Sequence, residues 1–288
     1  MGWRLLVTEP APGAWNMAVD EAVARAVDSG ESPPTLRFFR WQPPCLSLGF
    51  NQPYTVADAG FCRLHGVDIT RRPTGGRAVL HHHELTYSVA VPLGLAPLPR
   101  DLQGSYRLVC QGLVSGLRGL GVQAELSPAP SGLIHPKSAA PCFIQPAGGE
   151  IVVGGRKLVG SAMRRLGKVI LQHGSLLLGW DPFLQAGALG LASDTSLRTA
   201  VVTVGELLGE VPPWEVMVEH LAAGFSRTLE AELVPGALSP EERELASYLA
   251  REVYGHPRFV EKRVRPPLPG EGATDGEEGR GEALTFGT

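Results

Sequence analysis

The stretch VDITRRPTGGRAVLHHHELTYSVAVP, residues 67–92, places a glycine turn between two segments of strand-like composition. The run LTYSVAV at 85–91 alternates larger apolar residues with smaller or more polar ones, which predicts a strand that turns one face to the core. Thr74, Gly75 and Gly76 form the turn. The stretch therefore predicts two strands joined through a glycine turn.

The glycine turn admits two interpretations. A plain hairpin turn is the more frequent use of adjacent glycines between strands. Alternatively, the backbone freedom of glycine lets successive N–H groups point at an anion or a carbonyl oxygen. Arg71, Arg72 and Arg77 would add cations to such a substrate site. The turn is not a P-loop, because no Gly-Lys-Ser/Thr follows it and no helix is predicted to begin there.

Three consecutive histidines, His81, His82 and His83, follow the turn. Adjacent residues of a strand point to opposite faces, so at most His81 and His83 could share a metal ion, and no third ligand stands at a suitable spacing. The sequence therefore predicts no metal site. One of these histidines could instead orient a substrate or hold a polar network.

Segments on both sides of this stretch predict further strands and helices. Apolar residues at helical spacing predict helices at residues 14–30, 105–120, 214–233 and 241–255. The sequences TVGE at 203–206 and SPEE at 239–242 are typical capping boxes at helix starts. Short apolar runs predict strands at residues 35–41, 45–50, 150–153, 156–165 and 168–179, the last three as an antiparallel meander. A long loop rich in Pro, Ser and Ala fills residues 124–149.

Together these elements favour one α+β domain over residues 1–264. We expect a mixed, mostly antiparallel sheet flanked by helices, with a helical C-terminal portion. Residues 265–288 are polar, glycine-rich and acidic, so we expect a disordered tail there.

Composition narrows the class of protein. Apolar residues at 43% and charged residues at 19% are typical of a globular protein. The net charge is −3, so the chain lacks the excess of positive charge that is typical of proteins that bind nucleic acid or an anionic membrane. No run of about 18 apolar residues and no signal-like start is present, so we expect a cytoplasmic protein. The four cysteines lack a C-x-x-C spacing, which indicates neither a zinc site nor a disulfide framework.

Cys142, in the long loop, and Lys157, at the start of a predicted strand, form a candidate catalytic pair. Only four of the 26 basic residues are lysines. The presence of Lys157 beside an arginine in GRK therefore indicates a functional use of its amine. A cation about 4 Å from a thiolate attracts it by ~4 kcal/mol at an effective dielectric near 20, before desolvation is subtracted, which favours the nucleophilic thiolate. An inert buried thiol is the alternative for Cys142. Gly160, beside Ser161, leaves room for a close approach to the strand.

Two long motifs resemble one known family. The sequence RRPTGGRAVLHHHELTYSV closely resembles the Arg-Arg-x-Ser/Thr-Gly-Gly-x-Ala-Val-x-His signature of the biotin/lipoate protein ligase family. GRKLVGSAMRR resembles its Gly-Arg-Lys-x-x-Gly-Ser-Ala segment. Three further stretches are similar to other family segments and come in the expected order: NMAVDEAV, LRFFRWQPPCLSLGFNQ and ILQHGSLLLG. The resemblance runs from about Trp3 to Trp180. In one departure, His82 stands where the family often has aspartate.

The resemblance implies a class II synthetase-like domain that binds a lipoyl or octanoyl chain. AAPCF ahead of GRK is similar to the octanoyltransferase branch, which moves octanoate from acyl carrier protein to the glycine cleavage H protein through a cysteine thioester. By position, Cys142 would be the nucleophile and Lys157 the residue that lowers its pKa. Such a transferase needs no cofactor. The substrate-binding residues would be Arg71, Arg72, Thr74, Gly75, Gly76, Arg77, His81, Gly160 and Ser161.

Three other functions stay open. An ATP-dependent lipoate ligase would grip an adenylate with Arg71, Arg72 and Lys157. An amidotransferase of the same branch would take its acyl group from octanoyl H protein. A non-catalytic module would only bind an acyl carrier or a lipoyl domain, and Cys142 would be dispensable to it.

Overall fold

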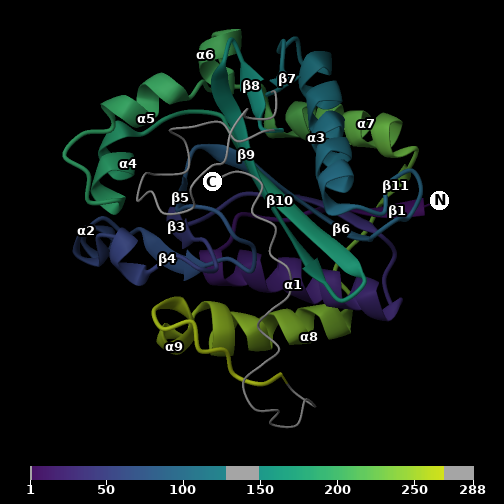
Figure 1. Cartoon of the computed structure of the whole chain (residues 1–288), viewed down its shortest axis with the longest axis horizontal. Coiled ribbons are helices and arrows are strands. Elements are labelled where there is room, and N and C mark those ends of the chain that lie inside the picture. Colours follow the sequence, from purple (N-terminus) through teal and green to yellow (C-terminus); the bar gives the residue numbers. More distant parts are fainter. Residues whose placement is uncertain (1, 128–148, 269–288) are drawn as a thin grey trace.

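An eight-stranded sheet forms the centre of the computed structural model, which describes residues 2–127 and 149–268 (Figure 1). The strand order is β11-β1-β2-β6-β10-β9-β8-β7. Strand β1 runs parallel to β2 and β11, and the other neighbours are antiparallel, as expected for a mixed sheet. The strands are β1 (Gly2–Val7), β2 (Thr35–Phe39), β6 (Glu84–Pro92), β7 (Glu125–Leu126), β8 (Ile151–Val153), β9 (Arg156–Leu166), β10 (Val169–Leu177) and β11 (Glu232–Pro235).

A second sheet of three strands has the order β4-β3-β5. Its strands are β3 (Cys45–Leu48), β4 (Asp68–Arg71) and β5 (Val79–His81). Strand β3 lies between the other two, parallel to β4 and antiparallel to β5. The glycine turn therefore connects two strands that are not neighbours, and the interpretation of it as a plain hairpin turn was wrong.

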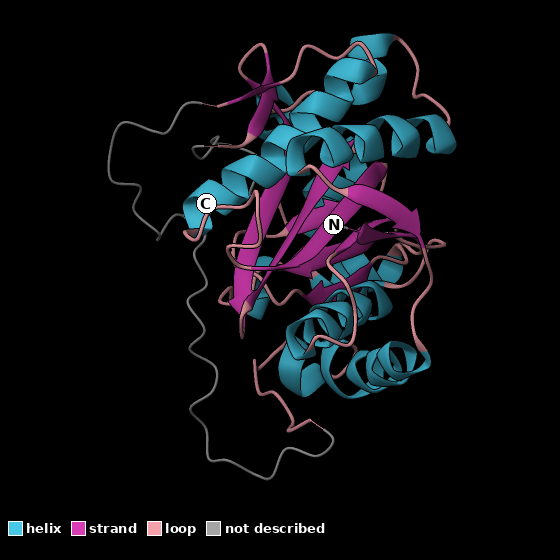
Figure 2. Ribbon diagram, turned by 90° about the vertical axis from the view of Figure 1, so that its right-hand side faces the viewer, coloured by secondary structure: helices cyan, strands magenta, loops and turns pink. Residues whose placement is uncertain are grey.

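Helices cover both faces of the large sheet, so that the strands lie between two helical layers (Figure 2). Helices α3 and α7 pack on one face, and α1 with α8 covers the other. No helix in the described part of the chain is long and apolar enough to cross a membrane. The helices are α1 (Gly13–Ser29), η1 (Tyr54–Val56), α2 (Ala59–Leu64), α3 (Leu102–Gly119), α4 (Pro182–Ala188), α5 (Thr195–Ala200), α6 (Val204–Leu208), α7 (Trp214–Leu229), α8 (Pro240–Leu249), the π-helix η2 (Ala250–Tyr254) and α9 (Pro257–Val260).

The alternation predicted for residues 85–91 is confirmed in β6. Leu85, Tyr87 and Val89 belong to the apolar core under α3 and α7. On the opposite face, Thr86 and Ser88 make buried hydrogen bonds, and Ala90 packs in the core beside α1. Both faces are buried because each is covered by helices.

Several predicted helix ends are confirmed, and one is wrong. Helix α1 ends at Gly30, whose φ of 82° is accessible to glycine at little cost. Ser239 forms the predicted capping box at the start of α8. Helix α7, predicted to reach residue 233, ends at Leu229 because Glu230 takes a left-handed conformation with φ 48°. The following residues form β11 beside β1.

The buried carboxylate of Glu21 ties the C-terminal segment to α1. It accepts hydrogen bonds from the Tyr254 hydroxyl at 2.5 Å, from Arg25 Nε at 2.8 Å and from Arg265. Leu268 is only 7% exposed. The first four residues assigned to the tail thus lie against the domain, and the disorder expected of the tail stays a prediction for residues 269–288, which lie outside the described residues.

Glu21 makes stability depend on pH in the acid range. Burial by itself raises the pKa of its carboxyl, but the charges of Arg265 and Arg25 outweigh burial and lower the pKa from 4.5 to about 2. Because the pKa of Glu21 is lower in the folded than in the unfolded protein, its carboxylate stabilises the fold at pH values above about 4.5. This stabilisation is lost as the pH falls from about 4.5 toward 2. We expect this single group to contribute on the order of 3 kcal/mol at neutral pH.

Urea unfolding across this pH range tests the expectation. Glu21→Gln is expected to lower the free energy of unfolding at neutral pH and to flatten its decline in acid. Glu244→Gln, at an exposed position of α8, is the matched control and should keep the wild-type slope. An unchanged slope in Glu21→Gln would contradict the assignment.

Candidate active site

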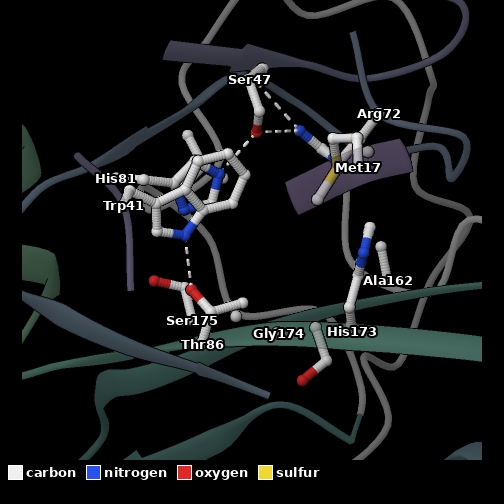
Figure 3. A pocket seen from close by; sticks show the side chains of 14 residues that line it. Met17, Trp41, Ser47, Arg72, His81, Thr86, Ala162, His173, Gly174 and Ser175 are labelled. Carbon is white, nitrogen blue, oxygen red and sulfur yellow. Dashed lines mark hydrogen bonds between the residues drawn. The ribbon is translucent and has the colours of Figure 1, made fainter. Parts of the chain in front are cut away.

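A cavity lined by residues of both sheets lies between them (Figure 3). Strands β3 and β5 of the small sheet form one wall, and β9 with β10 of the large sheet forms the other. Five residues predicted to bind substrate line it: Arg72, Gly76, His81, Gly160 and Ser161. The structure thus brings together two motifs that are about 80 residues apart in the sequence.

Arg72 holds the glycine turn in place. Its buried guanidinium donates to the carbonyl oxygens of Gly75 at 2.7 Å, Arg77 at 2.7 Å and Ser47 at 3.0 Å. Three carbonyls on one guanidinium leave the turn little freedom. Arg72 therefore binds the turn, while its side chain also forms part of the cavity wall.

The turn packs directly on the backbone that follows β3. A Cβ atom at Gly49 would lie only 1.9 Å from the carbonyl oxygen of Gly76, so the two backbones touch. Gly76 has a φ of 90°, a conformation that favours glycine. The N–H of Phe50 donates to the Thr74 carbonyl at 2.9 Å. Within the described ranges, the N–H groups of Gly75 and Gly76 make no hydrogen bond.

A buried chain of polar groups leads from the turn to α1. Thr74 Oγ1 lies 2.6 Å from His173 Nε2, and His173 Nδ1 lies 3.2 Å from Asp20 Oδ2. Arg37 Nη1 donates to Asp20 Oδ1 at 2.7 Å. The chain joins four parts of the fold: the turn, β10, α1 and β2.

The protonation states in this chain follow from burial and charge. Burial lowers the pKa of His173 despite the hydrogen bond to Asp20, so the imidazole is neutral. Burial would raise the pKa of Asp20, but the His173 hydrogen bond and the Arg37 charge lower it overall, so the carboxylate is ionised. Since a carboxylate can only accept, His173 donates from Nδ1 and accepts from Thr74 at Nε2. Thr74 is oriented by this arrangement.

His81 belongs to a second polar network on the opposite wall of the cavity. Its Nε2 lies 2.7 Å from Ser47 Oγ and its Nδ1 lies 2.6 Å from Glu84 Oε1. Thr86 and Ser175 also donate to the Glu84 carboxylate. The imidazole stacks on Trp41, with ring centroids 3.9 Å apart and planes 8° apart (Figure 3). This confirms that one of the three histidines holds a polar network.

His82 and His83 lie elsewhere. Strand β5 ends at His81, and the next two residues form the bend before β6, so strand alternation does not extend to them. Their rings lie on the same side, with centroids 3.8 Å apart, and Asp181 faces them. The expectation that only His81 and His83 could share a metal was wrong, because it assumed a strand through all three residues.

Lys157 is fully buried and donates to Glu150. Strands β8 and β9 bring the two together, since Glu150 immediately precedes β8 and Lys157 lies near the start of β9. Cys142, its expected partner, lies outside the described residues. The chain before and after that segment is held together, because Gly149 N donates to Ser127 O at 3.1 Å and Ser127 N donates to Glu150 O at 2.7 Å.

Arg71 is placed differently from the other predicted residues. Its guanidinium donates to backbone carbonyls of Gly49 at 2.8 Å, Gln52 at 2.7 Å and Val260 at 2.7 Å. It thereby joins β4 to the segment after β3 and to α9. It does not line the cavity formed by the described residues.

Sequence reasoning did not assign roles to Asp20, His173, Glu84 and Glu150. Asp20 lies in NMAVDEAV and His173 in ILQHGSLLLG, two segments whose resemblance was noted without a role for either residue. Glu84 follows His81 by three positions, across the bend between β5 and β6, and Glu150 precedes Lys157 by seven. A search for acidic residues near His81 and Lys157 would have found these two.

Comparison with known proteins agrees with this architecture. A model of the lipoyl protein ligase A/B catalytic domain matches residues 12–226. The chain belongs to this family. Among the family's solved structures, lipoate-protein ligase A bound with ATP superposes with a TM-score of 0.76 at 24% identity, over 92% of this chain and 100% of its own. A bipartite lipoate protein ligase of Thermoplasma acidophilum gives 0.76 at 24% identity, over 93% and 100%. These likenesses confirm the predicted fold.

Relatives within the family cover nearly the whole chain. Octanoyltransferase LipM of Kyrpidia tusciae is 45% identical over 87% of this chain and 97% of its own. Octanoyltransferase LipM of Symbiobacterium thermophilum is 41% identical over 88% and 96%. These matches confirm the resemblance that the two long motifs indicated, and they extend it over most of the chain.

The Thr74–His173 hydrogen bond is tested by a pair of variants. Thr74→Val keeps the shape of the side chain but leaves His173 Nε2 buried without its donor, so we expect the free energy of unfolding to fall by about 1–3 kcal/mol. Thr74→Ser keeps the hydroxyl and should lose less. Urea denaturation measures both, and equal losses in the two variants would contradict a role for the hydroxyl.

The Lys157–Glu150 pair is tested by a double-mutant cycle. Removing one partner of a buried ion pair leaves an uncompensated charge, so Lys157→Met and Glu150→Gln are each expected to cost about 3–5 kcal/mol in unfolding free energy. The double variant should fall short of the sum by about 0.5–3 kcal/mol. Strictly additive losses in urea denaturation would show that the two groups do not interact.

Proposed function

We propose that the protein is an octanoyltransferase of lipoate biosynthesis, which carries an octanoyl group from a thioester donor to a lysine of a lipoyl-type domain. The observation that carries the proposal is the 33–45% identity, over most of the chain, to relatives named octanoyltransferase LipM. The donor is octanoyl-acyl carrier protein, and the acceptor is the glycine cleavage H protein.

The cavity between the sheets suits an acyl chain. Its inner surface includes Met17, Ala162 and the backbone at Gly160 and Gly174. A Cβ atom at Gly174 would lie 2.5 Å from Ser161 Oγ and 2.6 Å from the Tyr87 ring, so no side chain fits at this position. Each buried methylene of an octanoyl chain contributes roughly 0.8 kcal/mol to binding.

Cys142 is the proposed nucleophile, and the chemistry of the other three cysteines supports the choice. Cys45, Cys62 and Cys110 are all buried. Burial raises the pKa of Cys45 well above its ordinary value, that of Cys62 to about 11 and that of Cys110 to about 12. Their thiols are protonated near neutral pH and are poor nucleophiles.

The position of Lys157 also supports the proposal. The segment that carries Cys142 leaves the described chain after Ser127 and rejoins it at Gly149, next to the Glu150 carboxylate that receives Lys157. In our proposal, Lys157 stabilises the Cys142 thiolate by its positive charge.

The proposed reaction has two acyl transfers. The Cys142 thiolate attacks the octanoyl thioester carbonyl, the C–S bond to the carrier's pantetheine breaks, and the pantetheine sulfur leaves with a proton from the Lys157 ammonium. The neutral acceptor amine then attacks the acyl-enzyme, an amide forms, and the Cys142 thiolate is released. The amine's proton then passes to Nζ of Lys157, which restores the ammonium that stabilises the thiolate. The N–H groups of Gly75 and Gly76 stabilise the oxyanion in both steps. Thioester exchange is nearly isoenergetic and amide formation is downhill, so no ATP is consumed.

The contacts of three cations argue against an ATP-dependent ligase. Such an enzyme would grip an adenylate with Arg71, Arg72 and Lys157. In the described chain Arg71 and Arg72 each donate to several backbone carbonyls, and Lys157 donates to Glu150. Gripping an adenylate would require breaking these buried interactions.

The test is to incubate the protein with octanoyl carrier protein in the absence of ATP and to measure its intact mass. We expect an octanoyl adduct that hydroxylamine releases and that Cys142→Ala does not form. Cys62→Ala, which removes a buried thiol of the described chain, is the matched control and should form the adduct.

Absence of an adduct, together with ATP-dependent labelling of a lipoyl domain by free octanoate, would overturn the proposal. Octanoyl H protein as the preferred donor would identify an amidotransferase instead. Binding of carrier protein with no transfer at all would identify a non-catalytic module.

A further inference from the structure

Three potential metal ligands meet at the bend between β5 and β6. One ring nitrogen of His82, one ring nitrogen of His83 and one carboxylate oxygen of Asp181 all lie within 4.8 Å of one another. His82 Nε2 is 3.9 Å from Asp181 Oδ2. The three side chains come from two segments nearly 100 residues apart in the sequence, and the site lies outside the cavity described above.

Backbone hydrogen bonds hold these two segments together without help from the three side chains. The carbonyl oxygen of His83 accepts from the N–H groups of Leu178 at 2.9 Å and Gly179 at 3.0 Å. A Cβ atom at Gly179 would lie 3.2 Å from His83 Cβ, so the glycine allows this close approach. The ligand-bearing backbone is thus positioned before any ion arrives.

Asp181 is oriented in a similar way. Its Oδ1 accepts from Leu184 N at 2.9 Å at the start of α4, which leaves Oδ2 directed toward His82. The side chains of His82 and Asp181 are each 29% exposed, so they can reach an ion from solvent. A carboxylate that holds one oxygen in a cap and presents the other is suited to monodentate coordination.

We propose that His82, His83 and Asp181 bind one divalent transition-metal ion, with zinc as the best match. Two imidazoles and one carboxylate form a common three-residue zinc ligand set that leaves a fourth position for water. Bonds of about 2.0–2.2 Å in tetrahedral geometry separate ligand atoms by roughly 3.3 Å. Side-chain rotations of the partly exposed His82, His83 and Asp181 close the remaining gap.

The ion restrains one wall of the cavity between the sheets from a position outside that cavity. Glu84 follows directly after the two histidines, and its carboxylate accepts from His81 and Ser175, which line the cavity. A metal between the β5–β6 bend and the segment before α4 therefore restrains the residues that hold His81. The proposal is independent of the octanoyltransferase assignment and gives the ion no step in the reaction.

Calorimetric titration of the full chain with zinc tests the proposal. The protein is freed of any affinity tag and stripped with a chelator before use. We expect one zinc per chain, and at least about a tenfold loss of affinity in each of His82→Ala, His83→Ala and Asp181→Asn. Asp181→Asn keeps an oxygen for the α4 cap, so it separates loss of a ligand from loss of fold. Cobalt substitution should give a visible d–d spectrum that the variants lack.

Two controls make the result decisive. His220→Ala removes a histidine from α7, and Cys142→Ala removes a thiol that could bind zinc on its own; both should keep wild-type affinity. The proposal is overturned if the wild-type chain binds no zinc. It is overturned equally if the three ligand variants bind as wild type does, or if binding is lost in His220→Ala or Cys142→Ala.

Discussion

The buried pair of Arg37 and Asp20 is the interaction on which the rest of the site depends. It places an ionised carboxylate under β10, where His173 must donate to it and therefore must accept from Thr74. Buried ion pairs contribute little net stability, because desolvation cancels much of the attraction. Their value here is geometric: helix α1 cannot shift on the sheet without moving the glycine turn.

Polar side chains help to join the small sheet to the large one. Glu84 of β6 accepts hydrogen bonds from His81 of the small sheet and from Ser175 of the large one, and Thr74 after β4 contacts His173 of β10. Within the small-sheet region, Ser47 contacts both Arg72 and His81. The same groups form the walls of the cavity. Docking of the sheets and construction of the site are therefore one process, and a change that loosens either one also affects the other.

The local sequence pattern was sufficient to predict most helices and strands. The alternation in β6 and the cap at Ser239, for example, depend only on residues that are neighbours in the sequence. Tertiary pairing was not predictable in this way. Of the two interpretations of the glycine turn, the hairpin was wrong because β3, from an earlier part of the chain, lies between the two strands that the turn connects. The His82–His83 bend and the partners of Lys157 and His173 likewise depend on contacts between distant segments. Whether Cys142 meets Lys157 stays a prediction.

The hydrogen bonds between Ser127, Gly149 and Glu150 close the base of the segment that carries Cys142. Because these bonds fix Ser127 against Gly149, the two ends between which the chain must close are set by the described part of the fold. Doubling such a loop costs only about 0.6 kcal/mol in closure entropy. The fixed distance between Ser127 and Gly149 therefore allows the number of residues between them to change at a small cost in closure entropy.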